Sequence, residues 1–437
     1  MSDTIFALSS ASGFAGVAVV RISGPKALFV AETVAHLKNP KPRYAHFVTL
    51  WNKDKELDKA LLIYFKAPSS FTGEDVIEIQ CHGSRAVLRA LFSILSDIDG
   101  CRLAEAGEFT RRAVYNNKMD LTAAEGLIDL IHADTEAQRA AAVRQMGGQL
   151  QKLYDGWREE LVKIMAYLEA FIDFPEEEIP EDKLKEIKDK ILNIQDQIHK
   201  HLLADNGVGE RLKSGFQVAI VGAPNVGKSS LLNALTQTDK AIVSDIAGTT
   251  RDVVEAYLDI SGYPVVLADT AGLRETKEVI EGKGVQKAIQ KAQDADLILA
   301  VISAENYPQV DEKTQNLIKN HPCFLVVWNK VDKKQVPADC LSICAKTGQG
   351  IDNLISRLKE IVEDKMSASS SALVTRLRYK TALSECDKAL SRAVDVDILE
   401  LKAEELRMAA RALGKITGFV RTEELLDVIF SSFCIGK

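Results

Sequence analysis

The segment Gly222–Ser229 constrains this chain more than any other part of its sequence. It reads Gly-Ala-Pro-Asn-Val-Gly-Lys-Ser, which fits the pattern G-x-x-x-x-G-K-S/T, and the apolar run Phe216–Val221 precedes it. In such a loop, glycines let backbone N–H groups surround phosphates, Lys228 reaches the β- and γ-phosphate oxygens, and Ser229 can bind Mg²⁺. We therefore predict a nucleotide-binding loop between a strand and a helix, within a mostly parallel sheet that has helices on both faces.

Two segments downstream of the loop predict how a phosphate-bound Mg²⁺ would be held. Asp269–Gly272 reads Asp-Thr-Ala-Gly and ends an apolar strand. There a carboxylate can hold a water of the metal, and a flexible glycine can sense the γ-phosphate. Gly248–Asp252 reads Gly-Thr-Thr-Arg-Asp and supplies Thr250 as a second metal ligand beside Ser229.

A further pair of segments predicts that the base is guanine. Asn329–Asp332 reads Asn-Lys-Val-Asp after an apolar strand. The Asp332 carboxylate can accept hydrogen bonds from N1–H and the 2-amino group of guanine, whereas adenine offers neither donor on that edge. The segment Ser342–Lys346 departs from the usual Ser-Ala-Lys because Cys344 stands in the serine position, either as a packed small residue or as a reactive thiol. The phosphate loop and the segments 248–252, 269–272 and 329–332, in this order along the chain, predict a GTPase domain.

The residue that orients the attacking water is less clear from the sequence. Many small GTPases carry a glutamine just after the Asp-x-x-Gly segment, but here that position is Leu273, which cannot form hydrogen bonds. An arginine that stabilises the transition state could be Arg251 or Arg274. Three glutamates follow Leu273, and composition leaves the choice among them open: Glu275, Glu278 and Glu281.

Changes of pattern along the chain predict an α/β multidomain protein. Residues 4–118 read mainly as short strands with one helix near 85–95, and the helical period begins past residue 119. Strands and helices then alternate until a Ser- and Ala-rich linker at 367–372. The expected domains are 1–118, a helical domain split into 119–214 and 367–437, and a GTPase domain at 215–366 inserted between its halves.

Composition limits the partners and the compartment. The chain has 437 residues, with 55 Lys and Arg against 62 Asp and Glu, a net charge of −7. It therefore does not coat nucleic acid by bulk positive charge, and any nucleic-acid partner must meet a local basic patch. Six arginines are candidates for such a patch. Seven scattered cysteines without a C-x-x-C pair, and no membrane-length apolar run, predict a soluble, cytoplasmic protein. Each of the six arginines is more simply read as a solvated surface charge; they are Arg85, Arg89, Arg111, Arg112, Arg139 and Arg144.

Other segments carry a family resemblance. These are Phe71–Asp75 (Phe-Thr-Gly-Glu-Asp), Gly107–Arg111 (Gly-Glu-Phe-Thr-Arg), Asp173–Pro175 (Asp-Phe-Pro) and the ending Phe433–Lys437 (Phe-Cys-Ile-Gly-Lys). With the nucleotide segments, they make the chain resemble the MnmE (TrmE) family of tRNA uridine-5-carboxymethylaminomethyl modification GTPases over essentially its whole length. The resemblance implies a β-rich, tetrahydrofolate-binding-like N-terminal domain, a helical domain and an inserted Ras-like P-loop GTPase domain.

For the GTPase domain, the resemblance implies that two domains dimerise across their nucleotide faces, with K⁺ acting where an arginine finger would. The K⁺ ligands would be the Asn225 side chain and the loop Ser244–Thr249, with carbonyls of Ser244 and Ile246. The water-orienting glutamate of the family aligns with Glu281. The expected GTP-binding residues are Asn225, Val226, Gly227, Lys228, Ser229, Ser230, Ser244, Asp245, Ile246, Ala247, Gly248, Thr249, Thr250, Asp269, Thr270, Ala271, Gly272, Asn329, Lys330, Asp332, Cys344, Ala345 and Lys346.

For the rest of the chain, the resemblance implies folate contacts and a partner. A tetrahydrofolate derivative would donate a one-carbon unit, and Cys434 would be either chemically active or packed at a domain contact. The homodimer would work with the FAD-dependent protein MnmG to add an aminomethyl or carboxymethylaminomethyl group to C5 of the wobble uridine (U34) of tRNA. The alternative is a GTP-controlled scaffold that binds RNA or ribosomes without one-carbon chemistry. The expected folate contacts are Arg21, Glu78, Lys118 and Lys437.

Overall fold

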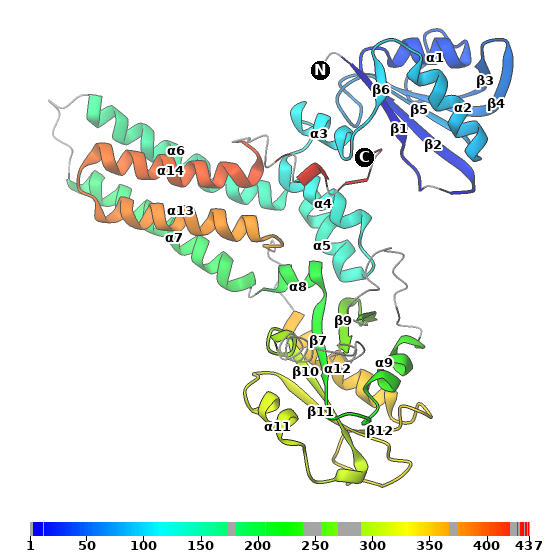
Figure 1. Ribbon diagram of the computed structural model, residues 1–437. Helices are drawn as coiled ribbons and strands as arrows, with labels where there is room; N and C mark the ends of the chain where they lie inside the picture. Colours follow the sequence, from blue (N-terminus) through cyan, green and yellow to red (C-terminus); the bar gives the residue numbers. More distant parts are fainter. Residues whose placement is uncertain are drawn as a thin grey trace, which may run out of the picture. The chain divides into compact units, whose positions relative to one another are not determined.

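The computed structural model describes most of the chain. It forms two compact units, one of residues 1–128, 146–160 and 410–437, the other of residues 129–145 and 161–409. Each unit contains a six-stranded sheet with its own buried core (Figure 1). The described residues are 3–11, 13–173, 181–205, 207–238, 241, 255–269, 290–366, 374–419, 426, 429–431, 433–434 and 436.

The sheet of the first unit has the strand order β3-β4-β5-β2-β1-β6. All neighbouring strands are antiparallel except β1 and β6, which run parallel. Two helices, α1 (Ala27–Ala35) and α2 (Arg85–Ser96), pack on one face of this sheet. The strands are β1 (Thr4–Leu8), β2 (Ala15–Ser23), β3 (Ala45–Asn52), β4 (Lys55–Phe65), β5 (Val76–Gly83) and β6 (Cys101–Leu103).

Alternation along β2 decides which residues face the helices. Ala18, Val20 and Ile22 are buried beneath α1 and α2, so Arg21 between them points to the opposite face. The helix α2 begins where expected, because the Ser84 side chain accepts a hydrogen bond from the Val87 N–H at 3.2 Å. The sequence pattern therefore predicted this helix.

The expectation of a single helix within residues 4–118 was wrong. The structure adds α1 and a third helix, α3 (Glu108–Tyr115). The buried residues of α1 follow the helical period, but its exposed face carries Leu28 and Phe29, so it lacks the broad polar stripe that marks an amphipathic helix. In α3 the buried residues include Glu108 and Arg112, which sequence reasoning reads as surface charges.

Arg112 corrects one of the expected solvated charges. Its side chain is fully buried, with N···O distances of 3.1 Å to Glu74, 3.0 Å to Asp3 and 3.0 Å to Glu108. Burial alone would raise the pKa of Glu108, but hydrogen bonds from Arg102, the Glu105 N–H and Arg112 outweigh it and lower that pKa. Glu74 and Glu108, one from each of the family-like segments 71–75 and 107–111, thus meet at this arginine.

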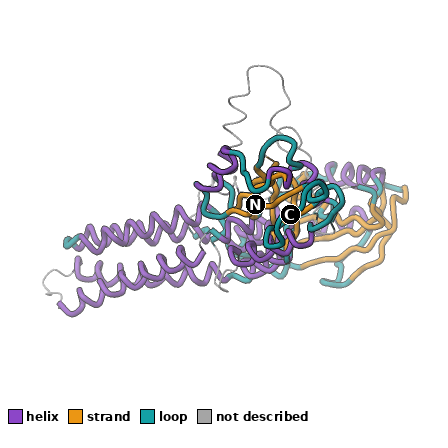
Figure 2. Tube along the Cα trace, turned by 90° about the horizontal axis from the view of Figure 1, so that it is seen from below, coloured by secondary structure: helices purple, strands orange, loops and turns teal. Residues whose placement is uncertain are grey.

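Long helices lie before and after the second sheet in the sequence; α4 belongs mainly to the first unit, and α6 and α14 contribute residues to both units. In the second unit, α7 packs along α13, and Gln195 donates hydrogen bonds to Asp387 and Ser391. Arg407 of α14 pairs with Glu169 of α6, and the long helices run side by side in Figure 2. The helices of this region are α4 (Leu121–Ile131), α5 (Glu136–Met146), α6 (Gln149–Asp173), α7 (Glu181–Asp205), α8 (Val208–Ser214), α13 (Leu377–Asp395) and α14 (Leu399–Thr417).

The second sheet has the order β12-β11-β10-β7-β9-β8, and every pair is parallel except β8 with β9. Val218 and Ile220 of β7 belong to one core cluster, with α8, α9 and α12, while Ala219 and Val221 belong to another with α11. This is the predicted mostly parallel sheet with helices on both faces. Its elements are β7 (Phe216–Val221), α9 (Lys228–Thr236), β8 (Glu255–Ile260), β9 (Tyr263–Asp269), β10 (Leu297–Ser303), a short 3₁₀ turn (Ala304–Asn306), α11 (Glu312–Lys319), β11 (Phe324–Asn329), β12 (Ser342–Ile343) and α12 (Ile351–Met366).

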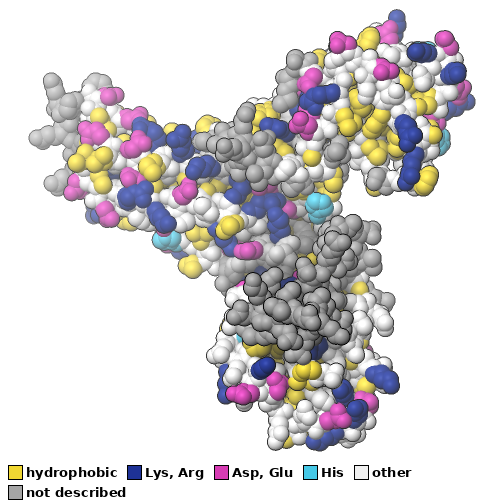
Figure 3. Space-filling model, in the orientation of Figure 1, with side chains coloured by type: hydrophobic (Ala, Val, Ile, Leu, Met, Phe, Trp, Pro, Cys, Tyr) yellow, Lys and Arg dark blue, Asp and Glu magenta, His cyan; other side chains and the backbone are white. Residues whose placement is uncertain are grey.

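The described surface carries charges of both signs. In Figure 3, Lys and Arg side chains are interspersed with Asp and Glu on the face that is visible. This mixture agrees with the net charge of −7 and with the absence of a bulk basic coat. Among the described helices, none is long and apolar enough to cross a membrane.

Candidate functional site

The predicted phosphate loop lies where β7 ends and α9 begins. Its glycines are required by close backbone approaches. A Cβ on Gly222, whose φ is +149°, would lie 2.2 Å from the Val301 carbonyl oxygen, and a Cβ on Gly227, whose φ is +99°, would lie 2.3 Å from Nδ2 of Asn329. The loop therefore packs tightly against β10 and β11. The helix α9 begins directly after the loop, so the N–H groups of its first turn lie at the same end of the sheet.

Lys228 is held over this loop by the loop itself. Its Nζ donates hydrogen bonds of 2.9 Å to the carbonyls of both Gly222 and Ala223, and its side chain is buried. An ammonium group fixed beside a helix N-terminus provides two sources of positive potential at one place. This arrangement suits a polyphosphate.

Asn329 connects three segments that the sequence treats as separate motifs. Its Nδ2 donates to the Val226 carbonyl at 2.8 Å, and its Oδ1 accepts from the N–H groups of Lys330 at 2.8 Å and Ala345 at 3.0 Å. The Lys330 ammonium also donates to the carbonyl of Asn225. The phosphate loop and the predicted base-reading loops are therefore joined into one site.

The predicted base-reading pair is also brought together. Cys344 is 1% exposed, and its thiol donates to Oδ1 of the exposed Asp332 at 3.2 Å. Its burial agrees with the packed alternative considered for this position. The sequence contained no signal for the contact itself, because twelve positions separate the two residues.

Parallel pairing places the other predicted residues at the same edge of the sheet. The carboxyl ends of β7, β9, β10 and β11 are aligned, and Asp269 stands at the end of β9, opposite Ile220. Ser229 and Ser230 are exposed in the first turn of α9, and Lys346 is exposed beside Ala345. Residues Ser244–Thr250, Thr270–Gly272 and Glu281 lie outside the described part of the chain.

The folate-type residues of the first unit form a second candidate site. Arg21 and Glu78 are cross-strand neighbours on β2 and β5, joined by a 2.8 Å ion pair, and each side chain is about one-sixth exposed. The Arg21 guanidinium lies 5.2 Å from the Phe71 ring centroid. Lys118 is exposed, and its side chain lies close to Gly73, which is in the same loop as Phe71. The sequence predicted the two charges but not their pairing or the aromatic neighbour.

The C-terminal segment lies against β1 of this unit. The Ser9 hydroxyl donates to the Gly436 carbonyl at 2.9 Å, and the Gly107 N–H donates to the Cys434 carbonyl at 3.4 Å. A Cβ on Gly436 would lie 2.1 Å from the Leu8 carbonyl oxygen. Cys434 is exposed, and Lys437 lies outside the described residues.

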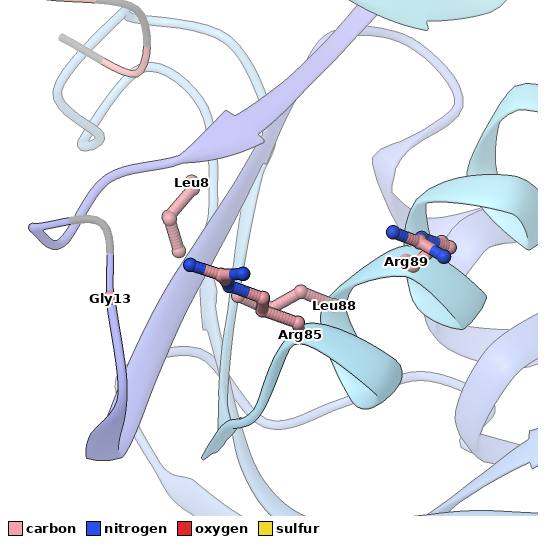
Figure 4. Close-up of a pocket in the computed structure, with 5 residues that line it drawn as sticks. All are labelled: Leu8, Gly13, Arg85, Leu88 and Arg89. Atoms are coloured by element: carbon pink, nitrogen blue, oxygen red, sulfur yellow. The ribbon is translucent and has the colours of Figure 1, made fainter.

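A hollow of about 460 Å³ lies on the other face of the same sheet (Figure 4). Leu8 lines it, and Leu8 pairs in register with the buried Val20, whereas Ala7 pairs with Arg21. Because side chains alternate between faces, the hollow is separate from the Arg21–Glu78 pair. Gly13, Arg85, Leu88 and Arg89 also line it.

Comparison with known proteins places these features in context. A family model described as the MnmE helical domain matches residues 121–434, and one described as the N-terminus of the GTP-binding protein TrmE matches residues 4–118. The tRNA modification GTPases MnmE of Parvibaculum lavamentivorans and Paramagnetospirillum magneticum are 48% and 46% identical to this chain, and that of Rickettsia rickettsii is 44% identical. Each alignment covers 100% of both sequences.

One solved structure is similar in sequence over a smaller part. The G domain of the T. maritima FeoB iron transporter is 26% identical, covering 33% of this chain and 98% of its own. Its TM-score is 0.26, which is too low to bear on the fold.

Proposed function

We propose, because this chain belongs to the MnmE family of tRNA modification GTPases, that it hydrolyses GTP to drive a conformational cycle in a complex that modifies the wobble uridine U34 of tRNA. The observation that carries the proposal is the contact of Asn329 with both the phosphate loop and Ala345, which brings Lys228 and Asp332 into one site. A lysine for phosphates and a carboxylate for the guanine edge are the two requirements for GTP.

The domain boundaries remain those proposed from the sequence pattern. We assign 1–118 to a tetrahydrofolate-binding-like domain, 119–214 and 367–437 to a helical domain, and 215–366 to the GTPase domain. The helical-domain model matches residues 121–434, and helices of this range both precede and follow the second sheet, which supports an insertion.

Mg²⁺ fits the GTPase site as a partner of the nucleotide. The Ser229 hydroxyl is exposed at the first turn of α9, beside the buried Lys228 ammonium. A magnesium ion typically takes few protein ligands and completes its shell with phosphate oxygens and water. We assign Ser229 and Thr250 as its protein ligands, and the ion would neutralise charge on the phosphates.

K⁺ stimulation on GTPase-domain dimerisation is the second part of the proposal. Asn225 lies in the phosphate loop with a φ of +63°. Its side chain is exposed and therefore accessible to a shared cation. Together with Ser244, Ile246 and Thr249 it would hold K⁺ near the β- and γ-phosphates. Hydrolysis should be much faster in KCl than in NaCl at equal ionic strength; equal rates in the two salts would contradict this role.

Glu281 is our assignment for orienting the attacking water, since Leu273 cannot do so. Glu281→Ala should keep GTP affinity and lose most of the turnover. Glu275→Ala and Glu278→Ala in the same segment are the controls, with turnover near that of the unsubstituted protein. A turnover loss in a control and not in Glu281→Ala would move the assignment to that glutamate.

A tetrahydrofolate derivative fits the first unit through its polar groups. The Glu78 carboxylate can accept hydrogen bonds from amino and N–H groups, and the Arg21 guanidinium can pair with a carboxylate of the ligand. Because Arg21 and Glu78 are paired with each other, each would replace part of that contact with a contact to the ligand. When bound, the folate supplies the one-carbon unit. Lys118, Lys437 and Cys434 complete the proposed site.

Binding of 5-formyltetrahydrofolate, measured by calorimetry, tests this site. Arg21→Ala should weaken it by at least tenfold, the scale of a lost charged hydrogen bond. Arg43→Ala is the matched control, because Arg43 is exposed in the same domain and also lies over an aromatic ring, that of Phe65. Failure of 5-formyltetrahydrofolate to bind the unsubstituted protein, with no change in Arg21→Ala, would favour the scaffold alternative.

The tRNA substrate and the partners are tested together in cells. We propose a homodimer that works with an FAD-dependent partner of the MnmG type, which installs the aminomethyl or carboxymethylaminomethyl group with it. Mass spectrometry of U34 in cells lacking this gene should show loss of the modified nucleoside, and the intact gene should restore it. Unchanged U34 would leave the GTPase without this substrate.

A further inference from the structure

The side chain that reads guanine is itself held by a buried thiol. Asp332 is exposed, whereas Cys344 is 1% exposed, and the thiol donates to Oδ1 of the carboxylate at 3.2 Å. An exposed aspartate samples a broad range of its terminal torsion, so its carboxylate plane is not fixed by packing. The hydrogen bond from Cys344 selects one orientation from that range.

The thiol can hold this orientation because hydrogen bonds fix the backbone of Cys344. The Cys344 N–H donates to the Gln349 carbonyl at 2.9 Å, and the Cys344 carbonyl accepts from the N–H groups of Gly348 at 2.9 Å and Thr347 at 3.1 Å. The next N–H, of Ala345, donates to Asn329. The sulfur therefore belongs to a closed turn that is anchored to the nucleotide site.

We propose that Cys344 is a positioning residue for specificity: by holding Asp332, it sets how strongly the site prefers guanine over a base that lacks the 2-amino group. The inference rests on the proposed function, that the chain binds guanine nucleotides. Bidentate hydrogen bonding to guanine requires both carboxylate oxygens of Asp332 to lie in the plane of the base edge. One oxygen accepts from N1–H and the other from the 2-amino group. Hypoxanthine keeps N1–H but has no 2-amino group, so it makes only one of these contacts.

The test compares GDP with IDP, which are not hydrolysed by the site. Calorimetry gives the ratio of their affinities for the full-length protein, for Cys344→Val and for Cys344→Ser. Valine keeps most of the packed volume without a donor, while serine restores a donor. Cys323→Ala is the control, because it removes a thiol from the same domain, and no described hydrogen bond joins that thiol to Asp332.

We expect Cys344→Val to reduce the GDP preference over IDP by roughly fivefold, the scale of one hydrogen bond. Cys344→Ser and Cys323→Ala should keep the preference of the unsubstituted protein. A loss of packing alone would weaken both nucleotides together and leave the ratio unchanged, which would overturn the inference. Failure of the unsubstituted protein to bind GDP would instead overturn the proposed GTPase function, so the two failures are distinguishable.

Discussion

The side-chain amide of Asn329 donates a 2.8 Å hydrogen bond to the carbonyl of Val226, which lies 103 positions earlier in the sequence. The oxygen of the same amide accepts from Lys330 and Ala345. Asn329 is 2% exposed, so these bonds are shielded from water. One side chain thus couples the geometry of the phosphate loop to that of the base-reading loops.

Asn329→Ala should weaken GDP and GTP alike. Three hydrogen bonds would be lost, at about 1 kcal/mol each, which corresponds to roughly a hundredfold lower affinity. Asn316→Ala, on the exposed side of α11 in the same domain, should leave the affinity unchanged. Calorimetry or fluorescent-nucleotide titration checks both. A change of less than threefold in Asn329→Ala would mean that the loops hold their geometry without this side chain.

Gly227→Ala should abolish nucleotide binding in a folded protein. The added Cβ would meet Nδ2 of Asn329 at 2.3 Å, and the φ of +99° is itself unfavourable for alanine. Gly262→Ala separates the two effects, because its φ is +85° but the nearest atom, Cβ of Glu136, is 3.6 Å away. The control should lose about 1 kcal/mol of stability and keep GDP affinity. Similar affinities in both variants would show that the contact relaxes at little cost.

How much of this could be predicted from the sequence differs between the two sites. The phosphate loop is a contiguous segment whose residue types follow from local chemistry, so Lys228 and Asp332 were found from spacing alone. The contacts that assemble them, such as Asn329 with Val226, depend on the order of parallel strands and leave no local pattern. The same holds for Ser9 and Gly436, which are 427 positions apart.

Arg112 shows why burial of charge is harder to predict. An arginine beside another arginine reads as a surface charge, and only the fold brings Glu74 and Asp3 to it. The helix α1 was missed for another reason: its exposed face carries the apolar Leu28 and Phe29, so the contrast between an apolar and a polar face is weak. Sequence patterns detect elements whose exposed face is polar and charges that stay at the surface, and neither α1 nor Arg112 fits that rule.

Gly436→Ala should release the C-terminal segment from β1. The new Cβ would lie 2.1 Å from the Leu8 carbonyl oxygen, at a φ of +104°. Hydrogen exchange should then speed up at Ser9, whose N–H bonds to the Val19 carbonyl, and folate affinity should fall if the segment contributes to that site. Gly148→Ala is the control, with a φ of +74° and no backbone atom near its Cβ. Unchanged exchange at Ser9 would show that the segment does not support this strand.

Arg112→Ala should lower the free energy of unfolding of the first unit by about 3–5 kcal/mol, because it removes the buried cation that pairs with Glu74 and leaves Glu108 with Arg102. The exposed pair of Arg139 and Glu136 provides a control, and Arg139→Ala should leave the stability nearly unchanged because solvent screens the pair. Thermal and denaturant unfolding measure both variants. Equal effects would mean that the buried network contributes no more than a surface pair.

The same network predicts how stability depends on pH. The folded-state pKa of Glu108 lies below its ordinary value of 4.5, so the unfolded chain binds a proton more readily than the folded one. The contribution of this carboxylate is therefore fully present above about pH 4.5 and is lost as the pH falls through the lower folded-state pKa. Glu108→Gln should flatten the part of the stability profile that lies below about pH 4.5. Glu136→Gln, at the exposed pair, should leave nearly all of the acid dependence in place, since solvent screens that pair. Parallel profiles for Glu108→Gln and the unsubstituted protein would assign the acid sensitivity to other carboxylates.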